Sequence, residues 1–362
     1  MRGGNRWGFR CAKRLPSNME HFFHTVRITN FKSLKNVTLS DCKRINVLIG
    51  KPNVGKSNIL EAIGLFGIGY SHLTKNKSLS QFIRATNFRE LFFDGNTKEQ
   101  ITVSIDYDSS NYSFCRVNVH EVIDDDWNAE EVIEILYSIE GTKSKFTLDK
   151  AFNIKLIENG TFFRVKQYKF LHGLALENIW FPYLMPPFGV NLLYVIQEHK
   201  QLKKELASFF SDYGLKLVFD TANHKLQIMK ELKDDEVFLL PYDSIADTLQ
   251  RIIFYKAAIA SNQDSILLFE EPEAHCFPPY IAHFTQEVIN SETNQFFIAT
   301  HSPYVLNDFL EYERNDVAIF IANFKNGETV IRRLTDDEVN DVYQYGIDLF
   351  FNHELFTDDQ EH

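Results

Sequence analysis

One eight-residue turn constrains the fold of this chain more than any other stretch. It runs Gly50-Lys51-Pro52-Asn53-Val54-Gly55-Lys56-Ser57, after an apolar run at 45–49 and before a segment at 57–65 with apolar residues at helical spacing. The run predicts a short buried strand and the segment predicts a helix. Glycines in the turn allow the backbone to curl, so that amide N–H groups and the helix N-terminus face an anion. The turn therefore has the features of an anion-binding loop.

The spacing of the turn, G-x-x-x-x-G-K-S, fits a P-loop. Lys56 would then reach the β- and γ-phosphates of a nucleotide, and the Ser57 hydroxyl would ligate Mg²⁺. The alternative is a chance glycine-rich connection, which average composition would produce in roughly 1% of chains of this length. The flanking strand and helix favour the nucleotide site. Its expected binding residues are Gly50, Lys51, Pro52, Asn53, Val54, Gly55, Lys56, Ser57 and Asn58.

Charge and cysteine content argue against several classes of protein. The formal net charge is −11, so the chain as a whole is not suited to wrap nucleic acid, although a local basic face stays open. Four cysteines without C-x-x-C spacing argue against a zinc ribbon or a disulfide framework. A reducing cytoplasm is therefore the expected location. We expect no membrane span, because the sequence has no run of about 18 apolar residues.

The first 20 residues differ from the patterned sequence that follows. They carry five basic residues before Met19, and no apolar stretch of the kind found in a signal peptide follows them. We expect residues 1–20 to be a disordered extension or the product of a misassigned start. The alternative is a basic arm for an anionic partner.

Strand patterns predominate between residue 24 and residue 180, outside the P-loop helix. The segment at 81–93 has a helical pattern instead. We expect an antiparallel β part here, with strands between 24 and 49, at 101–107, at 132–139 and within 146–165.

Residues 181–243 differ in composition and pattern from the residues before them. A Pro/Gly-rich loop at 181–190 precedes a helical pattern at 191–213, for which Gly214 is a natural end. Short strands follow at 215–229. We interpret this region as a helical lobe packed on the core of the protein.

From residue 244 onward, short apolar strands alternate with helices. Ser244 and Asp247 stand at the expected N-cap and N3 positions of the first helix. Such alternation predicts a mostly parallel sheet covered by helices. The strands are expected at 266–269, 296–300 and 317–322, and the helices at 244–260, 278–289 and 334–356.

Two carboxylates directly follow the apolar strand at 266–269. In a Walker B arrangement the first, Glu270, reaches Mg²⁺ directly or through water, and the second, Glu271, orients the attacking water. A strand running into an acidic turn is common, so this feature alone is weak. Its position about 200 residues after a P-loop makes it informative.

His301 follows the next predicted strand, in the sequence Thr300-His301-Ser302. Ligands of open α/β sheets bind at the carboxyl ends of the strands, which places this histidine near a γ-phosphate. An ordinary loop or core histidine is the alternative for His301 taken alone. The position of His301 in the chain, after the P-loop and the two carboxylates, favours a role in the site.

With these motifs the sequence resembles ABC-type ATPases of the SMC, RecF and OLD kind. Within them it is similar to short bacterial AAA family ATPases, which are often found beside a nuclease or toxin gene. The resemblance extends from His24 to about Asn352. It rests on five blocks in order, at 28–35, 50–62, 242–251, 269–275 and 300–303.

The resemblance implies that two subunits dimerise head to tail around ATP. Each P-loop would be closed in trans by the other subunit's signature, a Ser-x-Gly sequence before a helix. Here the matching residues are Ser244 and Ala246, so alanine stands where glycine is expected, and Asp247 adds negative charge. Ser244 as a simple N-cap is an equal alternative.

The chain departs from the family at two further points. Glu270 stands where most members carry Asp, which implies that Mg²⁺ is held through water and that turnover is slow. No Mg²⁺-sensing glutamine can be assigned, and Gln81 stays outside the site. The coiled-coil arms of SMC proteins and a C-terminal Toprim-type nuclease are not expected.

The fold expected from these features is α/β, a P-loop NTPase of ABC-ATPase type. It has a mostly parallel helix-covered sheet, an N-terminal antiparallel β part and a helical lobe insertion. Residues 21–180 would form the first part of the ATPase domain, 181–243 the lobe, and 244–362 the second part with the signature-like helix, Walker B and His301.

The leading functional hypothesis is a cytoplasmic ATPase with ATP and Mg²⁺ as cofactors and slow hydrolysis to ADP and phosphate. Its ATP-driven homodimerisation, or assembly into a higher oligomer, would regulate an effector protein such as a nuclease or toxin in bacterial anti-phage defence. One alternative is an ATP-gated DNA clamp of the RecF type, which the net charge does not support. Another is a nucleotide-bound scaffold with little hydrolysis.

Overall fold

The P-loop strand lies inside a six-stranded sheet whose strands come from distant parts of the chain. The computed structural model describes residues 22–356, apart from 74–76, 108–111, 124–128, 140, 160–163, 212, 221–222, 224 and 234–235. The extension expected over residues 1–20 therefore lies outside the described residues. The strand order is β16-β15-β3-β14-β13-β9. The bounds are β3 Ile45–Ile49, β9 Val165–Tyr168, β13 Ile266–Glu270, β14 Gln295–Ala299, β15 Val317–Lys325 and β16 Glu328–Arg333.

All neighbours in this sheet are parallel except β16, which pairs antiparallel with β15. Residues 45–49 of β3 are all buried, as expected for a parallel strand covered on both faces. The register pairs Glu270 of β13 with Ala299 of β14, and Ala299 with Leu48 of β3. The carboxyl ends of the three strands therefore meet at one edge. The predicted mostly parallel, helix-covered sheet is confirmed.

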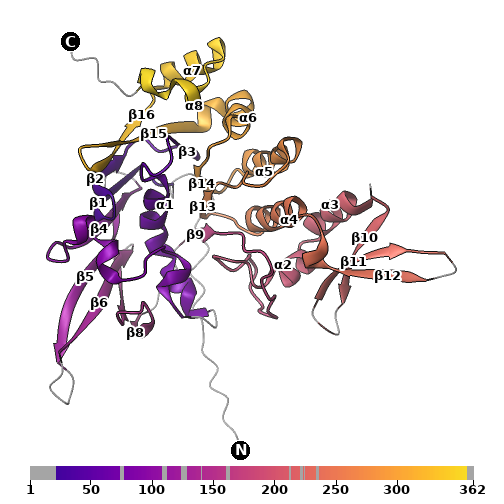
Figure 1. The fold of residues 1–362 in the computed structure, drawn as a ribbon, viewed down its shortest axis with the longest axis horizontal. Helices are drawn as coiled ribbons and strands as arrows, with labels where there is room; N and C mark the ends of the chain where they lie inside the picture. The colour runs from indigo at the N-terminus through magenta and orange to yellow at the C-terminus, as the bar shows by residue number, and fades with distance from the viewer. Residues whose placement is uncertain are drawn as a thin grey trace, which may run out of the picture.

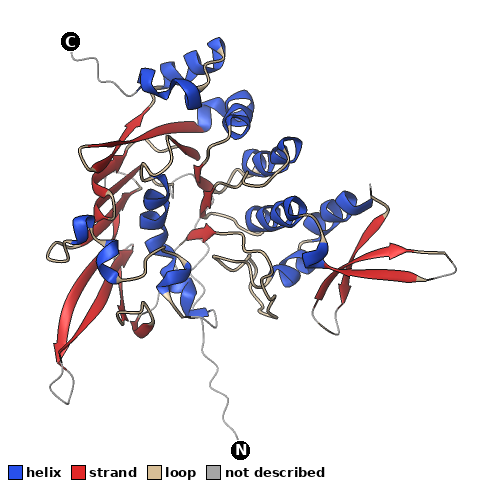
Figure 2. Ribbon diagram, in the orientation of Figure 1, coloured by secondary structure: helices blue, strands red, loops and turns tan. Residues whose placement is uncertain are grey.

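The sheet separates two hydrophobic cores, and it lies between helices on its two faces (Figures 1 and 2). Leu48 faces a core shared with helix α1, Lys56–Gly64, and with the antiparallel sheet, whereas Val47 faces a core built with the later helices. This alternation follows from the two-residue period of a strand. The later helices are α4 Asp247–Ala260, α5 Pro278–Asn290, α6 Pro303–Glu313 and α7 Asp336–Tyr345, and α8 Leu349–Asn352 follows them.

The expected antiparallel part is a seven-stranded sheet with the order β2-β1-β4-β5-β6-β7-β8. Residues 101–106 alternate between buried and half-buried, as their sequence predicts. The strand at 112–123 was not expected from the sequence. The bounds are β1 Thr25–Phe31, β2 Leu34–Leu39, β4 Ile101–Asp106, β5 Tyr112–Ile123, β6 Ala129–Ile139, β7 Thr142–Leu148 and β8 Ile154–Glu158.

A side lobe lies at one end of the molecule (Figure 1). It contains helices α2, Leu192–Glu198, and α3, Lys200–Ser211, where the sequence predicts one helix, because the chain leaves helical geometry at His199. Gly214 follows α3 with φ 67°, in the left-handed region that favours glycine. A three-stranded antiparallel sheet completes the lobe, formed by β10 Leu215–Asp220, β11 Lys225–Glu231 and β12 Val237–Pro241.

The helix predicted over 81–93 is wrong. Three short 3-10 turns occupy the region, at Leu79–Gln81, Phe88–Leu91 and Phe93–Gly95. Asn87 caps the second turn, and Asp94 interrupts the third with φ 51°. The apolar residues that suggested a helix are instead buried against the core. The helical C-terminal tail is confirmed, with a break at Gly346, where φ is 61°.

The capping pair predicted for Ser244 and Asp247 is also wrong. Ser244 ends a 3-10 turn, Tyr242–Ser244, and α4 begins at Asp247 with Ala246 as its N-cap. Asp247 is thus the first helical residue, where its carboxylate accepts a hydrogen bond from Arg251 Nε at 2.7 Å. The helix begins two residues later than the capping pattern requires.

Phe269 is a core residue of β13 and directly precedes the Walker B carboxylates. Its ring stacks on Tyr168 at 5.9 Å and meets Phe284 edge-on at 5.3 Å, and its side chain is fully buried. We predict that Phe269→Ala lowers the free energy of unfolding by about 3 to 5 kcal/mol, because the cavity cannot collapse within a stacked aromatic cluster. Guanidinium unfolding followed by circular dichroism measures it. Phe269→Leu serves as the control, and an equal loss for both variants would contradict the prediction.

Candidate functional site

The P-loop backbone is crowded by the two strands beside it. Gly50 has φ 143° and Gly55 has φ 100°. A Cβ atom added to Gly50 would lie 2.3 Å from the Ala322 carbonyl oxygen, and one added to Gly55 would lie 2.2 Å from Thr329 Oγ1. In the sequence, these glycines are explained by the need of the backbone to wrap a phosphate. The structure adds that β15 and β16 leave no room for a side chain at either position.

Lys56 is the first residue of α1 and is 6% exposed. Its Nζ donates hydrogen bonds to the carbonyl oxygens of Gly50 and Lys51, each at 2.8 Å, which holds the ammonium group inside the loop. Burial lowers the pKa of Lys56 to about 8, while the nearby carboxylates of Glu271 and Glu270 oppose the shift. The N-terminus of α1 adds unpaired N–H groups beside this ammonium. Together they fit a phosphate group.

Ser57 and Glu270 meet at the carboxyl edge of the sheet. The Ser57 hydroxyl donates to Glu270 Oε1, and Arg84 Nη2 donates to the same oxygen at 3.0 Å. A hydroxyl and a carboxylate are hard oxygen donors of the kind that Mg²⁺ takes together with substrate phosphates. The two residues predicted as metal ligands are thus in contact, and their chemistry fits that ion.

Glu271 and His301 form the second pair at this edge. Glu271 has φ 44°, and its N–H donates to the Ala299 carbonyl oxygen at 2.8 Å. His301 Nε2 lies 3.6 Å from Glu271 Oε1. Burial and the Lys56 charge lower the pKa of His301, and Glu271 opposes them. The net shift favours the neutral form of the imidazole.

A third carboxylate, Glu273, follows Glu270 and Glu271 closely in the chain. Its Oε1 accepts hydrogen bonds from Thr300 Oγ1 at 2.7 Å and from the His301 backbone N–H at 2.8 Å. Burial raises the pKa of Glu273, and these hydrogen bonds oppose that shift. Glu273 thereby fixes the backbone from which the His301 side chain projects. The signal in the sequence was a Glu directly after Glu270-Glu271-Pro272.

Three further charged residues at the site had no expected role. Glu61 on α1 is fully buried, and its carboxylate accepts hydrogen bonds from Lys32 Nζ and from Arg84 Nε, the latter at 2.8 Å. Lys32 lies in the turn between β1 and β2, and Arg84 lies after the first 3-10 turn. Lys32 and Glu61 fall within blocks that carry the family resemblance, whereas no sequence pattern marked Arg84. Gln81 lies three residues earlier and does not line the cavity.

The P-loop, Lys32, Arg84 and the carboxyl ends of the strands surround one cavity of about 450 Å³. Of the predicted P-loop residues, Gly50, Lys51 and Val54 do not line it, and Lys51 Nζ pairs with Glu354 Oε1 at 2.9 Å. The Asn58 side chain donates to Ser33 Oγ at 2.8 Å. The lining residues are Lys32, Pro52, Asn53, Gly55, Lys56, Ser57, Asn58, Arg84, Glu270, Glu271, Ala299 and His301.

The predicted signature residues, Ser244 and Ala246, lie apart from this cavity, directly before α4. Asp247 is paired with Arg251, and His172 Nδ1 lies 3.8 Å from its other oxygen. The negative charge that the sequence places beside an incoming anion is thus partly balanced within the subunit.

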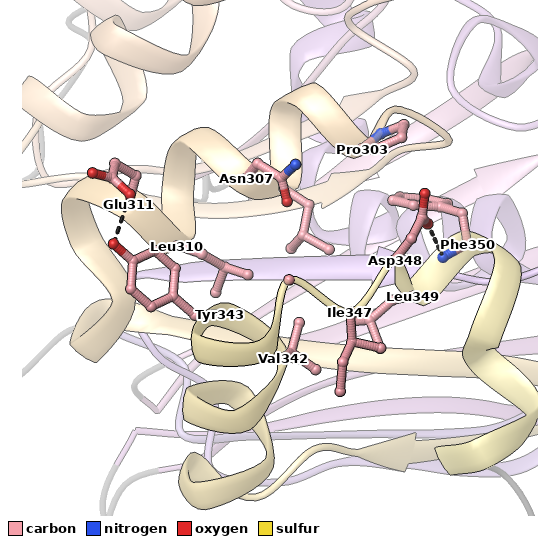
Figure 3. A pocket seen from close by; sticks show the side chains of 12 residues that line it. Pro303, Asn307, Leu310, Glu311, Val342, Tyr343, Ile347, Asp348, Leu349 and Phe350 are labelled. Atoms are coloured by element: carbon pink, nitrogen blue, oxygen red, sulfur yellow. Dashed lines mark hydrogen bonds between the residues drawn. The ribbon is translucent and has the colours of Figure 1, made fainter.

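A second hollow, of about 370 Å³, lies between α6 and the C-terminal helices (Figure 3). Leu310 and Val342 point into it, and the Tyr343 hydroxyl donates to Glu311 at 2.7 Å at one end. No basic residue lines it, so it does not suit a phosphate. The P-loop cavity is therefore the candidate site.

Two features are absent from the described residues. No group of three or more His, Cys, Asp or Glu side chains in this part of the chain could hold a metal ion. Within the same residues, no helix has the length and apolar character to cross a membrane.

We predict that Gly55→Ala lowers the free energy of unfolding by several kcal/mol. This is more than backbone strain alone would cost, because the added Cβ would also clash with Thr329. Gly95→Ala is the control, because Gly95 also has a positive φ, 69°, with no atom within 4 Å of an added Cβ. It should cost about 1 to 2 kcal/mol, the usual penalty of a left-handed residue. Adding Thr329→Ala to Gly55→Ala should restore part of the loss in urea unfolding. If Gly55→Ala and Gly95→Ala lowered the free energy of unfolding equally, crowding at Gly55 would not be the cause.

Known proteins have sequences similar to part of this chain. The chain is 27% identical over 97 residues to the DNA replication and repair protein RecF of Acetivibrio thermocellus, covering 27% of this chain and 26% of RecF. It is 34% identical over 92 residues to an ATP/GTP phosphatase of Helicobacter pylori, covering 24% and 25% of the two chains. The chain thus spans about a quarter of the length of these relatives.

A similar solved structure is the SMC head bound to the C-winged helix domain of ScpA. It covers 88% of this chain and 99% of that chain, with 14% identity and a TM-score of 0.49.

The family match covers more of the chain than the two sequence relatives do. Residues 45–307 match the family described as AAA domain, putative AbiEii toxin, Type IV TA system. This range begins at the P-loop strand, includes both Walker B carboxylates and His301, and covers well over half of the 362 residues. The chain therefore belongs to this AAA-domain family and is a P-loop ATPase of the ABC type with RecF-like relatives.

Proposed function

We propose that the protein binds ATP with Mg²⁺, hydrolyses it slowly, and uses ATP-driven dimerisation to control an effector protein. One observation carries the nucleotide part of this proposal. Lys56, Ser57, Glu270, Glu271 and His301 come from the ends of three parallel strands and line the same cavity.

Each of these side chains has a distinct task in the proposed reaction. The Lys56 ammonium and the N-terminus of α1 bind the β- and γ-phosphate oxygens and offset their charge. Ser57 and Glu270 hold Mg²⁺, which supplies further charge neutralisation when bound. Substrate would enter where the Lys56 ammonium already lies, held by two backbone carbonyls.

Glu271 and His301 act on the attacking water and the developing charge. The Glu271 carboxylate is half-exposed and free to accept a hydrogen bond from water, which orients the water toward the γ-phosphate. The neutral His301 donates a ring N–H to the transferring phosphoryl group as its charge develops. Glu273 keeps His301 in place through the backbone N–H.

Dimerisation is proposed because Ser244 and the N-terminus of α4 do not line the cavity of their own subunit. Ser244 and the N-terminus of α4 would close the cavity of a partner subunit, where helix-dipole and N–H groups favour a γ-phosphate. The pairing of Asp247 with Arg251 supports this contact, since it weakens the repulsion expected from an unpaired carboxylate. Ala246 in place of glycine and the longer Glu270 support slow turnover.

The effector part of the proposal rests on the family description, which names a putative toxin of a toxin–antitoxin system. Regulation of a nuclease or toxin in anti-phage defence is the form that we propose. The free cysteines Cys42, Cys115 and Cys276 suit a reducing cytoplasm. The similarity to RecF favours an ATP-gated DNA clamp as the second candidate.

We predict that Glu271→Gln lowers phosphate release at least 100-fold while ATP still binds, because a positioned base contributes about 10² to 10⁴ in rate. Phosphate release and the affinity for a fluorescent ATP analogue measure the two effects. Glu292→Gln is the matched control, since Glu292 is exposed and lies outside the cavity. Hydrolysis by Glu271→Gln at the parental rate would remove Glu271 from the mechanism.

We also predict that Mg-ATP converts the Glu271→Gln protein from a 42.2 kDa monomer to a species of twice that mass. Ser244→Glu added to it should abolish the shift, because a second carboxylate would face the partner's phosphates. Light scattering measures the masses. An ATP-independent mass would overturn the proposed dimerisation. Retention on duplex DNA that requires ATP and weakens with salt would favour the clamp.

A further inference from the structure

We propose that Arg84 is a positioning residue for the metal site: it holds the Glu270 carboxylate and must release it before Mg²⁺ binds that carboxylate directly. This inference rests on the proposed function and adds a step that controls how the metal enters. Three features of the structure support it: the anchor of Arg84, its contact with Glu270, and its place on a loop.

The anchor is the buried carboxylate of Glu61. Glu61 Oε1 accepts hydrogen bonds from Arg84 Nε at 2.8 Å and from the Arg84 backbone N–H at 3.3 Å, and Oε2 accepts one from Lys32. A fully buried carboxylate needs such partners, because an unpaired buried charge is strongly unfavourable. One edge of the Arg84 guanidinium is therefore fixed beside α1.

The other edge of the guanidinium faces Glu270. Arg84 Nη2 lies 3.0 Å from Glu270 Oε1, which also accepts the Ser57 hydroxyl. Ser57 and Glu61 are four residues apart on α1 and so lie on one face of the helix. Arg84 bridges from the buried end of this face to the carboxylate at its exposed end. Two donors already occupy the oxygen nearest to Ser57, so a cation at that oxygen has to displace at least one of them.

Arg84 has the freedom to be displaced. It lies between two 3-10 turns rather than inside a helix, and its side chain is 60% exposed in the wall of the cavity. Ser57 and Glu61, in contrast, are fixed by α1, and Glu270 ends a strand of the central sheet. Exchange of Arg84 for the metal is thus the movement that requires the least change elsewhere. A positive guanidinium 3.0 Å from a metal-binding oxygen also opposes the approach of a cation.

The test compares how much Mg²⁺ is needed for a fluorescent ATP analogue to bind. We expect Arg84→Met to lower the half-saturating Mg²⁺ concentration about tenfold, at the lower end of the effects seen when partners of metal ligands are changed. Arg89→Met is the matched control, because Arg89 is exposed, five residues away and outside the cavity, and should leave the Mg²⁺ concentration unchanged. An unchanged or increased requirement in Arg84→Met would overturn the proposal.

Lys32→Met distinguishes the loss of the Arg84–Glu270 hydrogen bond from the loss of a nearby positive charge. Lys32 binds Glu61 but has no hydrogen bond to Glu270, so its removal deletes the same charge nearby without freeing the metal-binding carboxylate. We expect it to change the Mg²⁺ requirement much less than Arg84→Met. Equal effects of the two variants would show that charge alone acts and would overturn the positioning role.

A second readout needs no nucleotide. Mn²⁺ binding to the protein alone, followed by the electron paramagnetic resonance signal of free Mn²⁺, should be tighter in Arg84→Met than in the parent. Arg84→Lys, which keeps a charge but cannot bridge two carboxylates, should lie between them. Tighter Mn²⁺ binding without any ATP binding would support the Arg84 step while refuting the proposed ATPase. Equal Mn²⁺ binding in a folded Arg84→Lys protein and in the parent would count against the step.

Discussion

The parallel register of β3, β14 and β13 is the constraint on which the site depends. Because Leu48, Ala299 and Glu270 lie level across the sheet, the residues that follow each strand emerge at one edge. The P-loop, His301 and Glu271 are thereby brought together from segments up to about 250 residues apart in sequence. Burial of both faces of the sheet holds this register, since a slip by one residue would exchange the apolar residues of its two cores.

The sequence predicts well the elements whose pattern is set locally. The strands at 45–49 and 266–270 are short apolar runs ended by a glycine or a carboxylate, and both occur where expected. It fails at 81–93, where the apolar residues occur at helical spacing but belong to short 3-10 turns. Their positions are set by packing against the core and not by a helix. It fails at 244–247 because a capping pair describes two residue types, while the helix start depends on the turn before it.

The same distinction applies to the candidate site. Lys56, Ser57, Glu270 and His301 can be predicted because each belongs to a motif whose residues are contiguous in the chain. Arg84 cannot, because its importance arises from contacts with α1 and β13 that no local pattern encodes. The glycines of the P-loop have a second reason that sequence alone does not show, which is the closeness of β15 and β16.

The side lobe is attached to the sheet in a way that has a mechanical consequence. The chain leaves the sheet through β9, forms the lobe, and returns through α4 to β13, the parallel neighbour of β9. The Tyr168 hydroxyl ties both connections, since it donates to the Leu184 carbonyl and accepts from Asn262. A force on the lobe would therefore act on β9 at its carboxyl end and, through α4, on β13 at its amino end, and β13 ends in Glu270. A load on the lobe would thus reach the carboxyl edge of the sheet, where the P-loop cavity lies.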